Sequence, residues 1–272
     1  MDPLPLVSIV MPVYNTAPFL EDAVKSILQQ SFSDFEFIII DDGSTDGSLD
    51  ILKAFRDERI VLLSNGINRG LVFTLHRGLK ASKGRYIARM DGDDISLPDR
   101  LKLQVEYMER HPEADLVSSF VDLIDEHGTH IGVWEDDRQH YTPSSIRSFL
   151  PENNSLAHPS VLAKAEIIRA LGYRTAQPDA EDYDLWLRWA STGHSLHKIA
   201  EPLVLHRIRK GSFTRLRQQN VYLKNATTKR RFLLNELWKG RLNMFVCKVG
   251  FMLLVDVAKG VMKMAFGKKR NG

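Results

Sequence analysis

The stretch Arg85-Tyr86-Ile87-Ala88-Arg89-Met90-Asp91-Gly92-Asp93-Asp94 decides the fold class of this chain. Its first part, 85–90, is a short run rich in apolar residues and is typical of a buried strand. The acidic part follows where that strand would end. A helical pattern precedes the stretch over residues 71–81, and Pro98 begins another that continues to about Arg110. The stretch is therefore the strand of an alternating strand and helix unit, with its acids at the carboxyl end.

The same unit recurs towards the N-terminus. Two more apolar runs, 6–11 and 35–40, indicate buried strands, and each is followed by a polar cluster, at 12–15 and 41–46 respectively. Such alternation predicts an α/β fold with a mixed, mostly parallel sheet flanked by helices. Because ligands bind beyond the carboxyl ends of parallel strands, we expect the three polar clusters to converge on one edge of the sheet.

The bulk composition is that of an ordinary folded protein. The chain has 272 residues, of which 43% are hydrophobic and 26% charged, and this excludes a disordered or low-complexity chain. Its one cysteine, Cys247, excludes an internal disulfide and favours a reducing compartment. The longest apolar run near the C-terminus, 249–255, is much shorter than the roughly 20 residues of a membrane-spanning helix. We therefore expect a cytoplasmic protein without a spanning segment.

Charge is divided unevenly along the chain. Residues 205–272 hold 17 lysines and arginines but only two acids, Glu236 and Asp256, although the net charge of the whole chain is only +3. This asymmetry predicts two parts with different tasks, an acidic α/β domain over 1–204 and a basic helical extension over 205–272.

The extension has two alternative explanations. Its pattern predicts two helices, at about 214–237 and 243–266, and the second could align apolar residues on one side: Met244, Phe245, Val249, Met252, Leu253, Val257, Met264 and Phe266. That stripe either packs back on the domain or lies, with the lysines beside it, on an anionic membrane surface.

Nucleic acid is the other polyanion that the basic extension could bind. No recognised binding motif is present, so we expect no nucleic-acid partner.

Three carboxylates share the tight turn at 91–94. Asp91, Asp93 and Asp94 form a set of hard oxygen ligands suited to Mg²⁺ or Mn²⁺. The alternative is an acidic turn that only caps the helix after Pro98. Like charges this close repel one another unless a cation is present, which favours the metal site.

A second acidic cluster follows the strand at 35–40. Asp41 and Asp42 are placed to accept hydrogen bonds from a base or a ribose, whereas residues 44–46 favour a cap of the next helix. The cluster is not a calcium-binding loop, because Lys53 stands where the final glutamate is required. No glycine-rich phosphate loop follows the first strand, so a bound nucleotide would depend on a metal for its phosphates.

Two further groups are ambiguous from the pattern alone. Glu181 and Asp182 begin a predicted helix, where acids usually act as caps, although one of them could serve as a general base in a cleft. His158 is a lone histidine in a predicted loop, and we expect a structural or exposed side chain there.

Taken together, these segments resemble the family-2 glycosyltransferases, which are inverting enzymes with the GT-A (Rossmann-like) fold. The resemblance covers roughly residues 5–215. It rests on segments that occur in the family's order and spacing: Val7–Asn15, Ile39–Asp46, Asn68–Gly70, Gly84–Asp94, Pro98–Leu101, His158–Ser160 and Glu181–Arg188. The chain departs from the family where relatives often have Tyr-Arg-x-His, because it has His206-Arg207-Ile208-Arg209. No histidine is therefore predicted as a metal ligand, and Arg207 or Arg209 is a candidate partner of the diphosphate.

The resemblance implies how the donor would bind. Pro12 and Tyr14 would line the pocket of the nucleotide base. Asp42, together with Asp41, would bind the base or the ribose.

It also implies the catalytic groups. Asp91 and Asp93 form the family's DxD motif, in which Asp93 would be the main ligand of Mn²⁺ or Mg²⁺ and Asp91 would contact the ribose or the metal. Asp182 would be the catalytic base, with Glu181 on the acceptor side.

The implied activity is metal-dependent, inverting transfer of a sugar from a nucleotide-sugar, UDP-sugars being the first choice. The acceptor would be a hydroxyl of a glycan or lipid-linked molecule in surface polysaccharide synthesis. The basic extension would attach the enzyme to the inner face of the cell membrane. A sugar-1-phosphate nucleotidyltransferase is the alternative enzyme, but it needs a glycine-rich loop that residues 12–15 do not supply. A membrane-associated scaffold without catalysis is disfavoured by the acids at 42, 91, 93 and 182.

Overall fold

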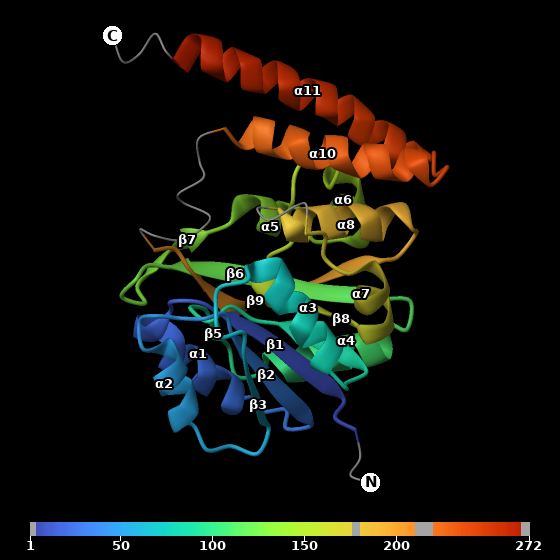
Figure 1. Ribbon diagram of the computed structural model, residues 1–272. Coiled ribbons are helices and arrows are strands. Elements are labelled where there is room, and N and C mark those ends of the chain that lie inside the picture. The colour runs from blue at the N-terminus through green and yellow to red at the C-terminus, as the bar shows by residue number, and fades with distance from the viewer. Residues whose placement is uncertain (1–3, 176–179, 210–219, 268–272) are drawn as a thin grey trace.

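One mixed sheet forms the centre of the molecule (Figure 1). The computed structural model describes residues 4–175, 180–209 and 220–267, the side chains of 265–267 excepted. In this part of the chain the strand order is β3-β2-β1-β4-β8-β6-β9-β5, and β7 pairs with β6 beside that path. The strands are β1 (Val7–Val13), β2 (Phe35–Asp41), β3 (Ile60–Ser64), β4 (Tyr86–Arg89), β5 (Ile95–Ser96), β6 (Leu116–Ile124), β7 (His130–Val133), β8 (Leu162–Lys164) and β9 (Leu196–Arg207).

The longest strand pairings are parallel. β1 pairs in parallel with β2 and β4, β2 with β3, and β6 with β9. β8 runs antiparallel to β4 and β6, while β5 and β7 run antiparallel to β9 and β6 respectively. The predicted mixed, mostly parallel sheet is therefore confirmed.

Helices flank the sheet on both faces, as predicted (Figure 1). They are α1 (Ala17–Leu28), α2 (Ser48–Ala54), α3 (Leu71–Ala81), α4 (Arg100–Arg110), α5 (Glu135–Gln139), α6 (Pro143–Phe149), α7 (Ala165–Leu171), α8 (Glu181–Ser191), α10 (Val221–Trp238) and α11 (Met244–Gly267), with a 3₁₀ turn at His158–Ser160.

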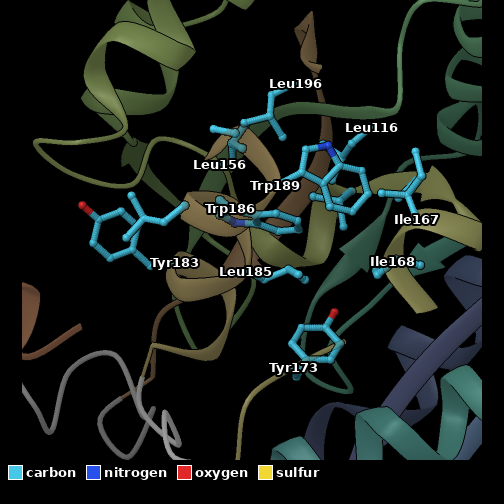
Figure 2. Close-up of a cluster of buried hydrophobic side chains, with 14 of the residues drawn as sticks. Leu116, Leu156, Ile167, Ile168, Tyr173, Tyr183, Leu185, Trp186, Trp189 and Leu196 are labelled. Carbon is cyan, nitrogen blue, oxygen red and sulfur yellow. The ribbon is translucent and has the colours of Figure 1, made fainter. Parts of the chain in front are cut away.

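The central strands are buried on both sides because alternate side chains enter two different cores. Val10 belongs to the core formed with α3, α7 and α8, whereas Ile9 and Met11 belong to the core formed with α1 and α4. Trp186 and Trp189 of α8 are fully buried in the first core. Figure 2 shows both tryptophans among the aliphatic side chains of that cluster.

The basic extension contributes to the first core. β9 continues from Leu196 to Arg207 and so passes through the boundary expected at 204. Phe232 of α10 and Phe245 and Val249 of α11 are all buried in the cluster that contains α8. Two residues of the predicted apolar stripe therefore face the body, so the packing alternative holds for this side of α11. Residues 210–219, where the first tail helix was expected to begin, lie outside the described part.

Candidate active site

The three polar clusters meet at one edge of the sheet, as the alternation predicts. β1 and β2 end side by side, with Val13 in register with Asp41. Just beyond them, the Asn15 N–H donates to Ser44 Oγ at 3.1 Å, and the Thr45 N–H donates to Asn15 Oδ1 at 2.8 Å. On the other side, Gly92 of the β4 turn lies so close that a Cβ there would be 3.3 Å from Val13 Cγ2. Tyr14 is 45% exposed at this edge, so its ring is accessible to a ligand.

The two acids after β2 organise the neighbouring loops. Asp42 Oδ1 accepts from Asn65 Nδ2 at 2.7 Å and from the Arg69 N–H at 2.8 Å, and its Oδ2 accepts from the Gly70 N–H at 2.9 Å. Asp41 accepts from the backbone N–H groups two and three residues ahead. Both carboxylates are therefore fixed in place at this edge of the sheet. Contact of either with a base or ribose stays a prediction.

Asp46, within the predicted cap at residues 44–46, caps two helices, α2 as predicted and α1 as well. Asp46 Oδ2 accepts from the N–H of Ala17, the first residue of α1, at 2.9 Å. α2 itself begins after Gly47, which has φ 92° and caps it without a side-chain hydrogen bond. Asp46 Oδ1 nevertheless accepts from the N–H of Ser48, the first residue of α2, at 3.0 Å, so the predicted cap of the next helix is confirmed for Asp46.

Asp91 lies in a compact group of possible metal ligands. Donor atoms of Asp91, Asp94 and His206 all fall within 4.8 Å of one another. His206 Nδ1 is 3.0 Å from Asp94 Oδ2, and Asp94 also accepts from the Arg207 N–H at 2.8 Å. Burial opposes protonation of His206, but the surrounding carboxylates, Asp94 first, outweigh it and raise its pKa to about 9. The ring is therefore protonated at neutral pH. It would have to release that proton to join the two carboxylates, which are the hard oxygen ligands that suit a divalent cation.

Asp93 lies beside this group and is paired with an arginine. Its Oδ2 is 2.8 Å from Arg209 Nε, and the Arg207 Nε donates to its backbone oxygen at 2.8 Å. Burial, followed by the charges of Asp94 and Asp91, raises the pKa of Asp93 to about 6. Burial keeps the pKa values of Asp91 and Asp93 raised even beside Arg89 and Arg209. The carboxylate oxygens of the turn are the hard ligands that a divalent cation takes. The assignment of Asp93 as the main ligand stays a prediction.

Arg89 connects the acidic turn to a second acidic pair. Its buried guanidinium forms an ion pair with Asp91, and its Nε has no hydrogen-bond partner in the described part of the chain. The same positive charge opposes the rise in the pKa values of Glu181 and Asp182 that burial causes. One cation therefore acts on both acidic groups.

Glu181 and Asp182 occupy the first turn of α8. Burial and the neighbouring Asp182 raise the pKa of Glu181 to about 8, so Glu181 is largely protonated at pH 7. Burial also raises the pKa of Asp182. Its Oδ1 accepts from the Tyr183 N–H at 2.7 Å and its Oδ2 accepts from Asn154 Nδ2 at 3.1 Å. These contacts fix a carboxylate of raised pKa at the site.

His158 is buried beside this pair. Its Nδ1 is 3.9 Å from Glu181 Oε1, and its Nε2 is 2.8 Å from the Tyr173 hydroxyl. Burial, with a contribution from Arg89, holds the pKa of His158 well below its usual value, so the ring is neutral. The structural alternative expected for His158 is confirmed, because the ring is buried and bonded to Tyr173, and it also lies beside Glu181.

Comparison with known proteins decides the family. Residues 8–159 match the model of the family described as glycosyl transferase family 2. The chain is 31% identical to an uncharacterised glycosyltransferase of Methanocaldococcus jannaschii over 92% of its own length and 87% of that protein. It belongs to glycosyl transferase family 2.

Two further comparisons extend this assignment. The O-antigen biosynthesis glycosyltransferase WbnJ of Escherichia coli is 34% identical over 68% of this family-2 chain and 72% of its own. S. aureus TarS 1–349, solved in complex with UDP-GlcNAc, superposes with a TM-score of 0.70 at 17% identity, covering 92% of this chain and 71% of TarS. The fold of this glycosyltransferase is therefore the one predicted. Membership of the family also favours glycosyl transfer over the nucleotidyltransferase alternative.

Sequence reasoning missed several groups of this family-2 site. Arg89 and Asp91 are two residues apart at the end of a strand, so period-two alternation could have placed them on one side. Asp94 and His206 come together only because β5 pairs with β9, in a register that joins Ile95 to Leu205. No local pattern predicts a two-residue strand, so this second contact had no signal in the sequence.

Proposed function

We propose that this family-2 glycosyltransferase is a metal-dependent, inverting enzyme that moves a sugar from a nucleotide-sugar, most directly a UDP-sugar, to an acceptor hydroxyl. The acceptor is a glycan or lipid-linked molecule in surface polysaccharide synthesis. One observation carries the proposal: Arg89 pairs with Asp91 in the turn of three carboxylates, and its charge also lowers the pKa values of the buried pair Glu181 and Asp182. The O-antigen role of WbnJ and the UDP-GlcNAc bound to TarS support the acceptor and donor classes.

The donor side of the site handles negative charge. Asp91 and Asp93 would hold the ion, with Asp94 and His206 as neighbouring donor groups. Mn²⁺ or Mg²⁺ supplies positive charge that neutralises the departing nucleoside diphosphate. Arg209 is 26% exposed at its side chain and lies beside this turn, so it supplies a further cation on the diphosphate side.

The acceptor side moves a proton. An acceptor hydroxyl oxygen forms a bond to the anomeric carbon while the bond from that carbon to the phosphate oxygen breaks, and the hydroxyl proton passes to Asp182. The raised pKa of Asp182 makes it a stronger base than an ordinary aspartate. Glu181 retains its own proton at neutral pH and can donate a hydrogen bond to the acceptor. Attack on the side opposite the leaving group inverts the anomeric centre.

We further propose that the enzyme works at the inner face of the cell membrane, attached peripherally through residues 205–272. A lipid-linked acceptor would be presented there, and the extension carries 17 bases against two acids. Among the described residues, none of the helices combines the length and apolar character needed to cross a bilayer.

A donor screen followed by product analysis tests the proposal. Nucleotide-sugars are added to the protein with Mn²⁺, with Mg²⁺ or with a chelator, and the unfolding temperature is recorded. We expect a UDP-sugar to stabilise the protein only when metal is present. NMR of the transferred product should then show the anomeric configuration opposite to that of the donor. Retention of configuration, or stabilisation by no nucleotide-sugar, would contradict the proposal.

A further inference from the structure

The outer side of the C-terminal helical pair is apolar. α10 and α11 form the outermost layer of the molecule, beyond α8 (Figure 1). Exposed residues of α11 recur at intervals of three and four along one side, which makes a continuous stripe. They are Met244, Cys247, Phe251, Leu254, Ala258, Val261 and Met262. Met244 is 91% exposed, Phe251 65% and Leu254 68%.

This stripe is not the side that packs on the body. Phe245, Val246 and Val249 fill the inner side of α11 and are buried in the core shared with α8. Further along, Gly260 is pressed so closely on α10 that a Cβ there would lie 2.6 Å from Leu223 Cδ2. The helix therefore cannot rotate to bury the outer stripe without emptying the inner one.

Both acids of the extension are turned inwards. Glu236 is fully buried and accepts from Ser191 Oγ at 3.0 Å. Asp256 is buried and pairs with Lys229 Nζ at 2.5 Å. Because no other acid exists in 205–272, the charged side chains that this segment exposes are bases, among them Lys239, Lys259 and Lys263. Two further exposed bases contact inward groups, since Lys248 Nζ donates to the Ser148 oxygen and Arg241 lies 3.8 Å from Glu236. The outer layer thus combines apolar side chains with positive charge alone.

We propose that this outer face is a docking surface for an anionic lipid bilayer, with α11 lying flat on it. The term "outer face" covers the stripe of α11, the exposed Lys259 and Lys263 of the same helix, and Trp238 and Leu242 at the junction of the two helices. The apolar residues would enter the boundary between headgroups and acyl chains, and the lysines would contact anionic headgroups. Trp238 is 85% exposed, and tryptophan is favoured at the membrane interface.

Charge selects this occupant over a second copy of the chain. If the outer faces of two copies came together, their lysines and arginines would repel one another. Neither extension has an exposed acid that could pair with those bases. An anionic bilayer supplies the missing negative charge. The docking surface deepens the proposed function. It rests on that function in one respect, namely that a lipid-linked acceptor would be found at a membrane.

Flotation of the full-length protein with vesicles tests the proposal. Phosphatidylcholine vesicles with and without phosphatidylglycerol are compared at low and high salt. Two pairs of substitutions alter the outer face, Phe251→Ser with Leu254→Ser and Lys259→Glu with Lys263→Glu. Two matched pairs alter exposed residues elsewhere, Ile131→Ser with Val133→Ser on β7 and Lys53→Glu with Lys80→Glu on α2 and α3.

The native protein should float with anionic vesicles at low salt and far less with neutral ones. Each outer-face pair should weaken vesicle binding about thirtyfold, while the matched pairs bind like the native protein. Equal binding by all variants, or no binding by the native protein, would overturn the proposal. So would a dimer in light scattering that Phe251→Ser with Leu254→Ser converts to monomer without any vesicle binding.

Thermal shift with a nucleotide-sugar separates the two proposals. The outer face lies away from the acidic turn, so every outer-face variant should keep the donor response. Absence of vesicle binding by the native protein, with a normal donor response, would refute the docking surface and the membrane attachment but not the proposed sugar transfer. Normal vesicle binding without a response to any donor would refute the proposed sugar transfer alone.

Discussion

Arg209 Nε lies 2.8 Å from Asp93 Oδ2, and this ion pair places a fixed positive charge on the second acid of the DxD motif. The first acid is paired in the same way, because the buried guanidinium of Arg89 contacts Asp91. Arg209 stands where the family pattern often has histidine, which is a possible metal ligand. Both acids assigned to the metal are therefore already in contact with arginine, and a divalent cation has to compete for them.

Restoring the family residue should tighten metal binding. In Arg209→His the competing guanidinium is absent, so Mn²⁺ affinity measured by calorimetry without donor should rise about tenfold, the factor that one charge-assisted contact accounts for. Asp93→Ala should instead weaken metal-dependent donor binding. Arg59→His, which breaks the Arg59–Asp57 pair just before β3, at the end of that strand away from the site, is the matched control. Unchanged or weaker Mn²⁺ binding by Arg209→His would show that the ion pair does not compete.

Glu181 should destabilise the protein as the pH rises. Its pKa is about 8 in the folded protein and near 4.5 in the unfolded chain, so stability falls between these values and levels off above 8. Glu181→Gln cannot ionise, and its unfolding temperature at pH 8 should exceed that of the native protein by roughly 2–4 °C, a gap that narrows towards pH 5. Glu113→Gln is the control, because the pKa of Glu113 is lowered by hydrogen bonds. A gap independent of pH would mean that Glu181 is ionised throughout.

The extension should be needed for stability. Phe232 of α10 is fully buried in the core that contains the two tryptophans of α8. Phe232→Ala should therefore lower the free energy of unfolding by roughly 3–5 kcal/mol in denaturant titrations. Leu234→Ala on the same helix changes a side chain that is 60% exposed and should cost about 0.5 kcal/mol or less. Similar losses in the two variants would show that α10 does not pack as described.

Much of the fold follows from local pattern. The buried runs that became β1, β2 and β4 sit in register, and their polar ends meet as expected, because Val13 lies beside Asp41 and Gly92 packs on Val13. The other half of the sheet, which contains β5 and β8, was harder to predict from sequence. β8 contributes only Leu162–Lys164, and β5 only Ile95–Ser96. Strands of two or three residues form because neighbouring strands pair with them. They are too short to show a strand's alternation of apolar and polar residues in the sequence.

The candidate site, like the fold, could be predicted from sequence only in part. The carboxylates at 91–94 and 181–182 can be singled out from sequence, because acids cluster after a strand or at a helix start. Their partners cannot, since Arg209 reaches Asp93 and His158 reaches Tyr173 through tertiary packing alone. The apolar stripe predicted for α11 combines residues of two sides, because Phe245 and Val249 belong to the core while Met244 is exposed. Both sides of that helix are apolar, and periodicity does not say which one faces inwards.

The central claim is that Asp182 removes the acceptor proton. It is tested most directly by the transfer rate of Asp182→Asn at saturating donor, measured beside donor affinity in the presence of Mn²⁺. The amide keeps the shape of the side chain and cannot take up a proton. We expect donor affinity to stay within about twofold of native while the transfer rate falls at least 100-fold. Native transfer rates in Asp182→Asn would contradict the assignment of the base and, with it, the proposed mechanism.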